Sequence, residues 1–217
     1  MSPFVRKVMM AAHETGLAER IELVRSLVAM NKVNPAVMRD NPLSKIPTLV
    51  TDEGLVLFDS DVICEYLDSL HPGPRLIPSE PTLRWQALRW NALGSGFMDA
   101  LVLWRNERMR PEEHRSPETL AAYGHKCSAT LDWIEREASA LHAAHFGLGH
   151  IAIGCALGYL DLRFADVAWR DTHPASAHWF AGLCERPSAQ VTEASFADRL
   201  VPSPAPAAAD APTGPTP

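Results

Sequence analysis

The pattern of the chain changes across a stretch punctuated by prolines, residues 71–81, and this change constrains the fold more than any other feature. Before this stretch, helix-like and strand-like segments alternate, whereas every periodic segment after it is helical. Alternation predicts an α/β unit, and a purely helical pattern predicts an all-α unit. We therefore expect an α/β domain over residues 1–72, a linker over 73–81 and a helical domain over 82–190.

The first domain is expected to have the order α-β-α-β-β-α. Apolar spacing predicts the helices, β-branched residues predict the strands, and Asp-Glu-Gly predicts the turn of a hairpin. Asp59-Ser60-Asp61 supplies capping side chains for the last helix of this domain. The expected elements are a helix over 4–15, a strand over 21–24, a short helix from 34 to before 41, a hairpin over 48–58 and a helix over 62–70.

The second domain is expected to contain four helices, over 83–110, 118–144, 151–164 and 175–185. The helix over 151–164 is apolar nearly all round, which predicts that it forms the buried core of this domain. Residues 202–217 are rich in proline and alanine and lack large apolar side chains. Such a segment has little to bury, so we expect a disordered tail.

Charge and cysteine usage exclude several classes of protein. The net charge is −6, from 20 basic and 26 acidic residues, which argues against a nucleic-acid binder. The longest apolar run, 151–160, is well short of the ~20 residues that span a bilayer, so no membrane association is expected. The four cysteines show neither metal-ligand nor disulfide spacing, which predicts reduced thiols, no metal and a cytoplasmic location.

Three segments of the chain carry recognisable motifs. The first is Ser-Pro-Phe-Val-Arg-Lys-Val over 2–8, the second runs over 41–67 from Asn-Pro-Leu-Ser-Lys-Ile-Pro-Thr-Leu through Phe-Asp-Ser-Asp to Glu-Tyr-Leu, and the third is the apolar helix over 151–160. In this order and spacing they resemble the glutathione transferase family. The resemblance covers about residues 2–190 and is closest to bacterial members. It implies a thioredoxin-like domain followed by an all-helical domain, glutathione as co-substrate, and a role in detoxification. It further implies a small apolar electrophile as second substrate and a homodimer.

The resemblance also assigns residues to glutathione binding. Ile46-Pro47 is similar to the family's cis-proline turn, whose backbone pairs with the cysteinyl part of glutathione; otherwise Pro47 is an ordinary trans proline that begins a strand. Asp59 and Ser60 match the acidic-Ser pair that holds the γ-glutamyl group, and their alternative role is helix capping. Lys45 is a candidate for the glycyl carboxylate, or else a solvated lysine.

Ser2 is the candidate catalytic residue, because it stands at the start of the first helix, where thioredoxin-like folds place their thiol chemistry. Its hydroxyl would donate a hydrogen bond to the glutathione sulfur, and the helix dipole would favour the nucleophilic thiolate. The alternative is a simple N-cap. A second hypothesis for the whole chain is a non-catalytic binding or structural protein that keeps this fold.

Two departures from the family stand out. Family members have a central β-strand before Ser-Pro-Phe, and the sequence given begins at Met1, so low stability and low activity are expected. Before the core helix the family has a Ser/Thr-x-x-Asp capping box, where this chain has Gly147-Leu-Gly-His150, and His150 is expected not to act as the reciprocal cap. His142, His145 and His150 are expected at the surface. Trp85 and Trp90 are expected in the core or at a dimer interface, and Met98 and Trp104 at an apolar pocket.

Overall fold

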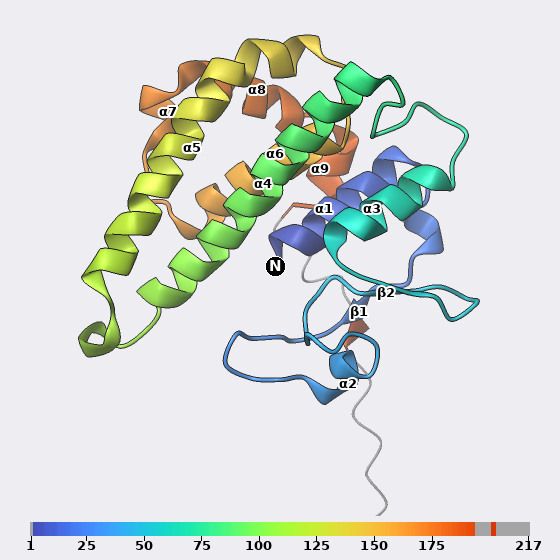
Figure 1. Cartoon of the computed structure of the whole chain (residues 1–217), viewed down its shortest axis with the longest axis horizontal. Helices are drawn as coiled ribbons and strands as arrows, with labels where there is room; N and C mark the ends of the chain where they lie inside the picture. Colours follow the sequence, from blue (N-terminus) through green and yellow to red (C-terminus); the bar gives the residue numbers. More distant parts are fainter. Residues whose placement is uncertain (1, 194–200, 203–217) are drawn as a thin grey trace, which may run out of the picture.

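The computed structural model describes residues 2–193 and 201–202. In the first domain, helices α1 (Pro3–Glu14) and α3 (Ser60–Ser69) pack side by side, and the short strands lie below them in the view of Figure 1. The remaining elements of this domain are η1 (Ala18–Arg20), β1 (Val24–Arg25), α2 (Pro35–Met38), β2 (Leu49–Val50) and β3 (Val56–Leu57). The fold class expected from the sequence, a thioredoxin-like domain followed by a helical one, is confirmed.

Within the described residues, the strands form two small sheets. Strands β2 and β3 are antiparallel, with Leu49 opposite Leu57, and the turn between them uses Gly54 at a φ of +83°, where a side chain would be strained. Strand β1 pairs in parallel with β4 (Val201–Pro202), so Val24 lies opposite Val201. The expected strand over 21–24 is therefore wrong in position, since pairing begins only at Val24. Of the tail over 202–217, only Pro202 lies within the described residues.

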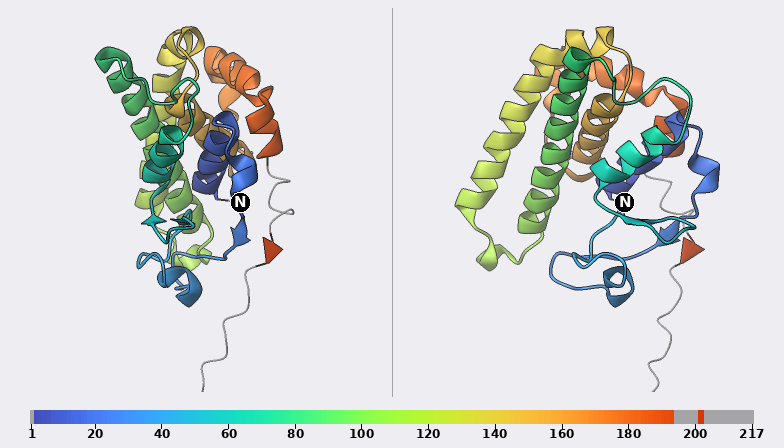
Figure 2. Two further views of the ribbon diagram at one scale, coloured as in Figure 1. Left: turned by 90° about the vertical axis from the view of Figure 1, so that its right-hand side faces the viewer. Right: turned by 45° about the vertical axis from the view of Figure 1, so that its right-hand side comes forward.

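The second domain is a helical bundle, and Figure 2 shows its long helices side by side from two further directions. Helix α6, the predicted core helix, is buried along nearly its whole length and packs most closely against α4. A Cβ atom on Gly94 of α4 would lie 2.5 Å from the backbone carbon of Ala152, so glycine is required for this close approach. The helices are α4 (Pro81–Arg108), η2 (Glu112–His114), α5 (Pro117–Ala143), α6 (Leu148–Arg163), α7 (Trp169–Thr172), α8 (Pro174–Cys184) and α9 (Pro187–Val191).

Helix α1 joins the two domains, because it packs against α3 on one side and against α6 and α9 on the other. At its carboxyl end, Arg186 donates two hydrogen bonds to the Glu14 carboxylate, at 2.7 and 3.0 Å, and Ser188 donates a further one. Burial raises the pKa of Glu14, but the hydrogen bonds and the charge of Arg186 outweigh it and lower the pKa overall. The position of α1 is thus set by the helical domain as well as by its own.

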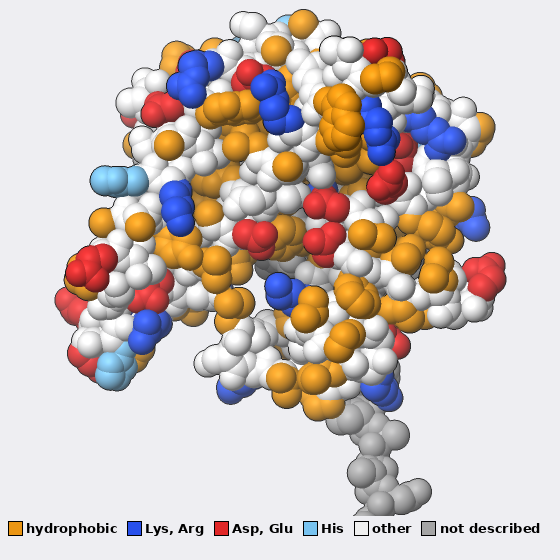
Figure 3. All heavy atoms as spheres, in the orientation of Figure 1, with side chains coloured by type: hydrophobic (Ala, Val, Ile, Leu, Met, Phe, Trp, Pro, Cys, Tyr) orange, Lys and Arg blue, Asp and Glu red, His pale blue; other side chains and the backbone are white. Residues whose placement is uncertain are grey.

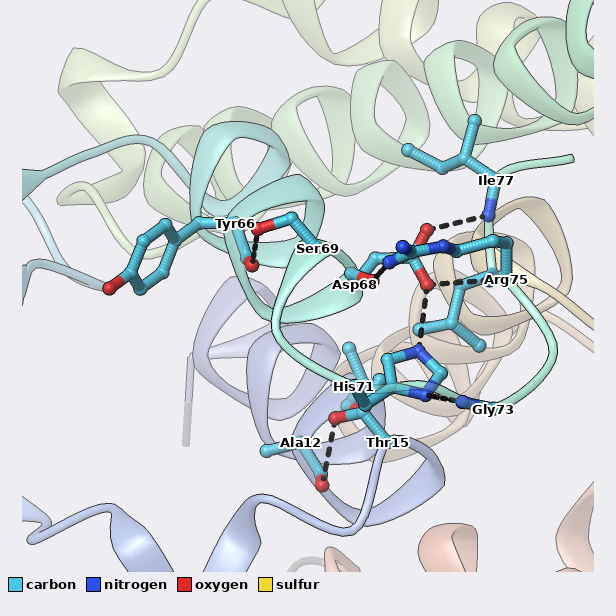
Figure 4. Close-up of polar contacts among 11 residues, drawn as sticks. Ala12, Thr15, Tyr66, Asp68, Ser69, His71, Gly73, Arg75 and Ile77 are labelled. Atoms are coloured by element: carbon cyan, nitrogen blue, oxygen red, sulfur yellow. Dashed lines mark hydrogen bonds and ion pairs between the residues drawn. The ribbon is translucent and has the colours of Figure 1, made fainter. Parts of the chain in front are cut away.

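The linker between the domains is held by the buried side chain of Asp68, near the end of α3 (Figure 4). Its carboxylate accepts hydrogen bonds from the backbone N–H of Leu76 at 2.7 Å and of Ile77 at 3.1 Å, and from the His71 ring at 3.1 Å. The other ring nitrogen of His71 accepts from the Gly73 N–H at 3.1 Å, which indicates the neutral tautomer. The turn after α3 therefore has a defined path.

Several expectations about burial are wrong. His150 is buried rather than at the surface: its Nδ1 accepts from the Gly147 N–H at 3.1 Å and its Nε2 lies 3.0 Å from the Leu141 carbonyl oxygen. A neutral imidazole thus serves as the reciprocal cap that was expected to be missing. Met98 is 0% exposed and therefore cannot line an open pocket. Trp90 is 2% exposed, so of the two roles expected for it, core or dimer interface, it has the core role.

Candidate functional site

Helix α1 places Ser2 at its N-terminus. Pro3 occupies the first helical position, where a missing N–H costs nothing, and Ser2 has extended backbone angles that suit an N-cap. The Val5 N–H lies 3.5 Å from the Ser2 Oγ, so the hydroxyl oxygen acts as a weak acceptor. A hydroxyl that accepts one hydrogen bond still has its own proton to donate. The capping role and the catalytic role predicted for Ser2 are therefore compatible.

The loop before β2 carries Lys45, Ile46 and Pro47, and buried Asn41 shapes it. The Asn41 amide nitrogen donates to the Lys45 carbonyl and to the Thr48 hydroxyl, both at 3.1 Å, and its amide oxygen accepts from the Leu43 N–H at 3.0 Å. The Ile46–Pro47 peptide bond is cis, as the resemblance implies. No hydrogen bond joins the backbone N–H or C=O of Ile46 to another residue of the described chain. The Lys45 side chain is exposed.

Helix α3 places Asp59 and Ser60 at its N-terminus. Asp59 is the N-cap, and its carboxylate accepts from the Asp61 N–H at 3.0 Å. Asp59 is exposed, so one of its oxygens can still meet a ligand. Ser60 is only 2% exposed, and its hydroxyl makes no hydrogen bond within the part of the chain that the structure describes. The N-terminal N–H groups and the positive end of the helix dipole suit a carboxylate at this place.

The two helix N-termini lie at the same end of the packed pair α1 and α3 (Figure 1). Lys7 of α1, whose side chain is 0% exposed, donates hydrogen bonds to Asp61 of α3 and, at 2.9 Å, to the Ser95 hydroxyl of α4. An ammonium group buried to this extent requires such partners. The contact of Lys7 with Asp61 thus links α1, which begins after Ser2, to the first turn of α3, which begins after Asp59.

Acidic side chains gather over the middle of the face in Figure 3, above a hollow, with a basic side chain below it. The pKa of Asp99, on α4, is raised overall, and burial is the main cause. The charge of Lys45 lowers this pKa, whereas the charges of Asp59 and Asp61 raise it. Lys45, Asp59 and Asp61 are thus within electrostatic reach of Asp99. The combination of carboxylates with an exposed lysine suits a ligand that carries both an ammonium group and a carboxylate.

Sequence reasoning missed Lys7, Asp61, Asn41 and Asp99. Lysine is rarely buried, so a lysine between Arg6 and Val8 reads as a solvated side chain, and only the packing of α1 against α3 and α4 reveals its partner. Asn41 carries a local signal, because asparagine before proline initiates turns, but its reach to Lys45 and Thr48 does not follow from spacing alone.

Among the described residues, no cluster of three or more histidine, cysteine or acidic side chains has an arrangement that could hold a metal ion. All four cysteines are unpaired thiols. Burial raises the pKa of Cys64 to about 12, and those of Cys127 and Cys155 to about 11. Within the same residues, no helix is both long and apolar enough to cross a membrane.

Comparison with known proteins identifies the family. Residues 1–70 match the glutathione S-transferase N-terminal domain, and residues 118–182 match the C-terminal domain. An uncharacterized GST-like protein, YibF of Escherichia coli K12, is 34% identical over 88% of this chain and 94% of its own. A glutathione transferase family member from Pseudomonas fluorescens Pf-5, solved with bound glutathione, is 42% identical, with a TM-score of 0.86 over 88% of this chain and 94% of that one.

A glutathione S-transferase from Methylobacillus flagellatus KT, also solved with glutathione bound, is 34% identical and has a TM-score of 0.77 over 88% of this chain and 95% of that one. Both domain matches, the order of the elements and the relatives that cover nearly the whole chain agree with one another. The chain belongs to the glutathione S-transferase family.

Proposed function

We propose that the chain is a glutathione transferase that activates the glutathione thiol for attack on a small apolar electrophile. The observation that carries this proposal is the position of Ser2 and the Asp59–Ser60 pair at the adjacent N-termini of α1 and α3. Relatives solved with bound glutathione support the choice of ligand. Two helix dipoles that point their positive ends at one place favour both a thiolate and a carboxylate there.

The proposed binding mode assigns one part of glutathione to each element. At the start of α3, Ser60 and the helix N–H groups bind the γ-glutamyl carboxylate, and Asp59 accepts from the γ-glutamyl ammonium. The free backbone groups of Ile46 pair with the cysteinyl part as an added strand. Exposed Lys45 meets the glycyl carboxylate.

In the proposed reaction, the Ser2 hydroxyl donates a hydrogen bond to the glutathione sulfur, which stabilises the thiolate once the thiol proton has passed to solvent. The sulfur lone pair then forms a bond to an electrophilic carbon, and a leaving group departs with its bonding pair. Leu103, one helical turn from Asp99 on α4 and 39% exposed, offers an apolar surface beside the charged groups. An apolar electrophile matches that surface.

We further propose that the protein is a cytoplasmic homodimer with a role in detoxification. Unpaired, buried thiols suit a reducing compartment. Leu83 and Trp85 on α4 are 52% and 70% exposed, and Val62 on neighbouring α3 is 46% exposed. Exposed apolar side chains of this size suit a two-fold contact with a second copy.

The Ser2→Ala variant tests the chemistry. We expect its turnover of glutathione with a reactive aromatic chloride to fall by about 10- to 100-fold, the value of one hydrogen bond to a charged group, while glutathione affinity changes little. Ser69→Ala, a hydroxyl at the opposite end of α3, is the matched control. Turnover of Ser2→Ala equal to wild type refutes the role of Ser2. Glutathione binding by wild type without turnover refutes the transferase and leaves a binding protein.

A further inference from the structure

Helices α1 and α6 pack against each other in opposite directions. Cys155 of α6 contacts Met10 of α1, with 3.6 Å between their sulfur atoms. Further along α6, the Arg6 side chain occupies the space beside Gly158. Residue numbers thus fall along α1 as they rise along α6. The start of α1 therefore lies toward the end of α6, as Figures 1 and 2 show.

The face of α6 that meets α1 ends in a cation. Side chains four positions apart lie on one face of a helix, so Cys155, Tyr159 and Arg163 form a single row along α6. Eight positions separate Cys155 from Arg163, and eight positions separate Met10 from Ser2. Since Cys155 is level with Met10, the row brings Arg163 to the end of α1 at which Ser2 stands.

Helix α4 adds a second cation at the same end. Leu101 of α4 is 1% exposed in the core, and Arg105 follows one turn later on the same face of the helix. The ring of Trp104 stacks on the ring of Phe164, with 4.6 Å between the ring centroids, which fixes this part of α4 against the end of α6. Arg105 and Arg163 therefore lie at the same end of the bundle.

Tyr159 is the neighbour that these two arginines share. Its pKa is raised overall, mainly by burial, whereas the charges of Arg105 and Arg163 lower it. Its hydroxyl therefore keeps its proton at neutral pH, and both guanidinium groups are within electrostatic reach of it. The side chain is 7% exposed, so its ring adds an apolar wall beside the two charges.

The positive charge of Arg105 and Arg163 is not balanced by the acidic residues of this region. Asp161 and Asp166 form ion pairs with other arginines, at 2.6 and 2.7 Å. Neither Arg105 nor Arg163 forms an ion pair within the part of the chain that the structure describes. Arg105 is partly exposed and Arg163 is exposed, so an anionic ligand can reach both.

We propose that Arg105 and Arg163 determine specificity for the second substrate by binding a carboxylate, so that the electrophile combines an apolar body with one carboxylate. This inference rests on the proposed function, because it places the electrophile beside the glutathione sulfur that Ser2 meets. A guanidinium group stays charged and binds a carboxylate through two parallel hydrogen bonds. With an aromatic chloride, the thiolate sulfur forms a bond to the ring carbon and chloride departs with its bonding pair, while the carboxylate keeps its charge.

The test compares 4-chloro-3-nitrobenzoate with the neutral 4-chloro-3-nitrobenzamide. Each kcat/KM is divided by the rate constant of the uncatalysed reaction with glutathione, which removes the difference in intrinsic reactivity. Wild type is expected to prefer the acid. In Arg163→Gln and in Arg105→Gln this preference is expected to fall by about tenfold or more, the value of one hydrogen bond to a charged group. Arg105→Lys, which keeps the charge, is expected to retain more of the preference than Arg105→Gln.

Arg136→Gln, which removes an exposed arginine from α5, is the matched control and is expected to keep the preference. Circular dichroism establishes that each variant is folded, and added salt is expected to weaken the preference of wild type. An unchanged preference in both glutamine variants, an equal fall in Arg136→Gln, or a wild type that turns over the amide without preferring the acid overturns this inference alone. A wild type that turns over neither substrate overturns the proposed function as well.

Discussion

The contact between α4 and α6 gives a prediction that needs no ligand. A Cβ atom on Gly94 would lie 2.5 Å from the Ala152 backbone carbon and 2.6 Å from the Ile153 nitrogen, so Gly94→Ala cannot be accommodated by a side-chain rotation. The two helices must separate, and overpacking of this kind costs about 1–3 kcal/mol, more than the ~0.5–1 kcal/mol that alanine gains as a helix former. Gly94→Ala is therefore expected to destabilise the protein by about 1–2 kcal/mol.

Gly96, two residues further along α4, provides the matched control. A Cβ atom there meets nothing within 4 Å, so Gly96→Ala is expected to stabilise the protein by about 0.5–1 kcal/mol through helix propensity alone. Since about 2–4 °C corresponds to 1 kcal/mol in a chain of this size, the two variants should melt roughly 5–10 °C apart in calorimetry. Equal melting temperatures for the two variants would refute the close packing of α4 on α6.

Three further results are expected. Burial lowers the pKa of His150 in the folded protein below 6.5, so on acidification the imidazole is protonated in the unfolded chain at a higher pH than in the folded one. The free energy of unfolding should therefore fall as the pH drops below about 6.5. In His150→Gln, denaturant titrations at several pH values should show a weaker dependence of stability on pH. Trp85→Glu should shift the proposed dimer toward monomer in sedimentation, because it places a charge on the exposed apolar surface of α4; a wild type that sediments as a monomer contradicts the dimer. Truncation after Pro202 should leave the melting temperature unchanged, since the residues beyond it are mostly proline and alanine, and a drop of several degrees would contradict this.

Local patterns in the sequence predicted the elements well where one turn or one face decides the structure. Ser2 and Asp59 are N-caps, one of the two roles that the sequence left open for each, and the apolar run from Ile151 forms the buried core of the helical domain. These features depend on neighbours in the chain, so spacing and residue type suffice to predict them.

Long-range contacts could not be predicted in the same way. Lys7 and Asp61 are separated by 54 positions, and nothing near either residue indicates a partner. The reciprocal cap by His150 was missed because it requires a neutral imidazole with an acceptor and a donor on opposite nitrogens, a role that the sequence pattern assigns to carboxylates. The strand expected over 21–24 was misplaced because pairing in a sheet depends on distant segments, here Val201 opposite Val24.

The most direct test of the central claim is a calorimetric titration of wild type, Asp59→Ala and Ser60→Ala with glutathione, with circular dichroism to establish that each variant is folded. Glutathione is expected to bind wild type and to bind each variant about tenfold or more weakly, because each loses a hydrogen bond to a charged ligand group at the start of α3. Absence of binding to wild type, or equal affinity in folded variants, would show that Asp59 and Ser60 only cap the helix and would contradict a glutathione site at this place.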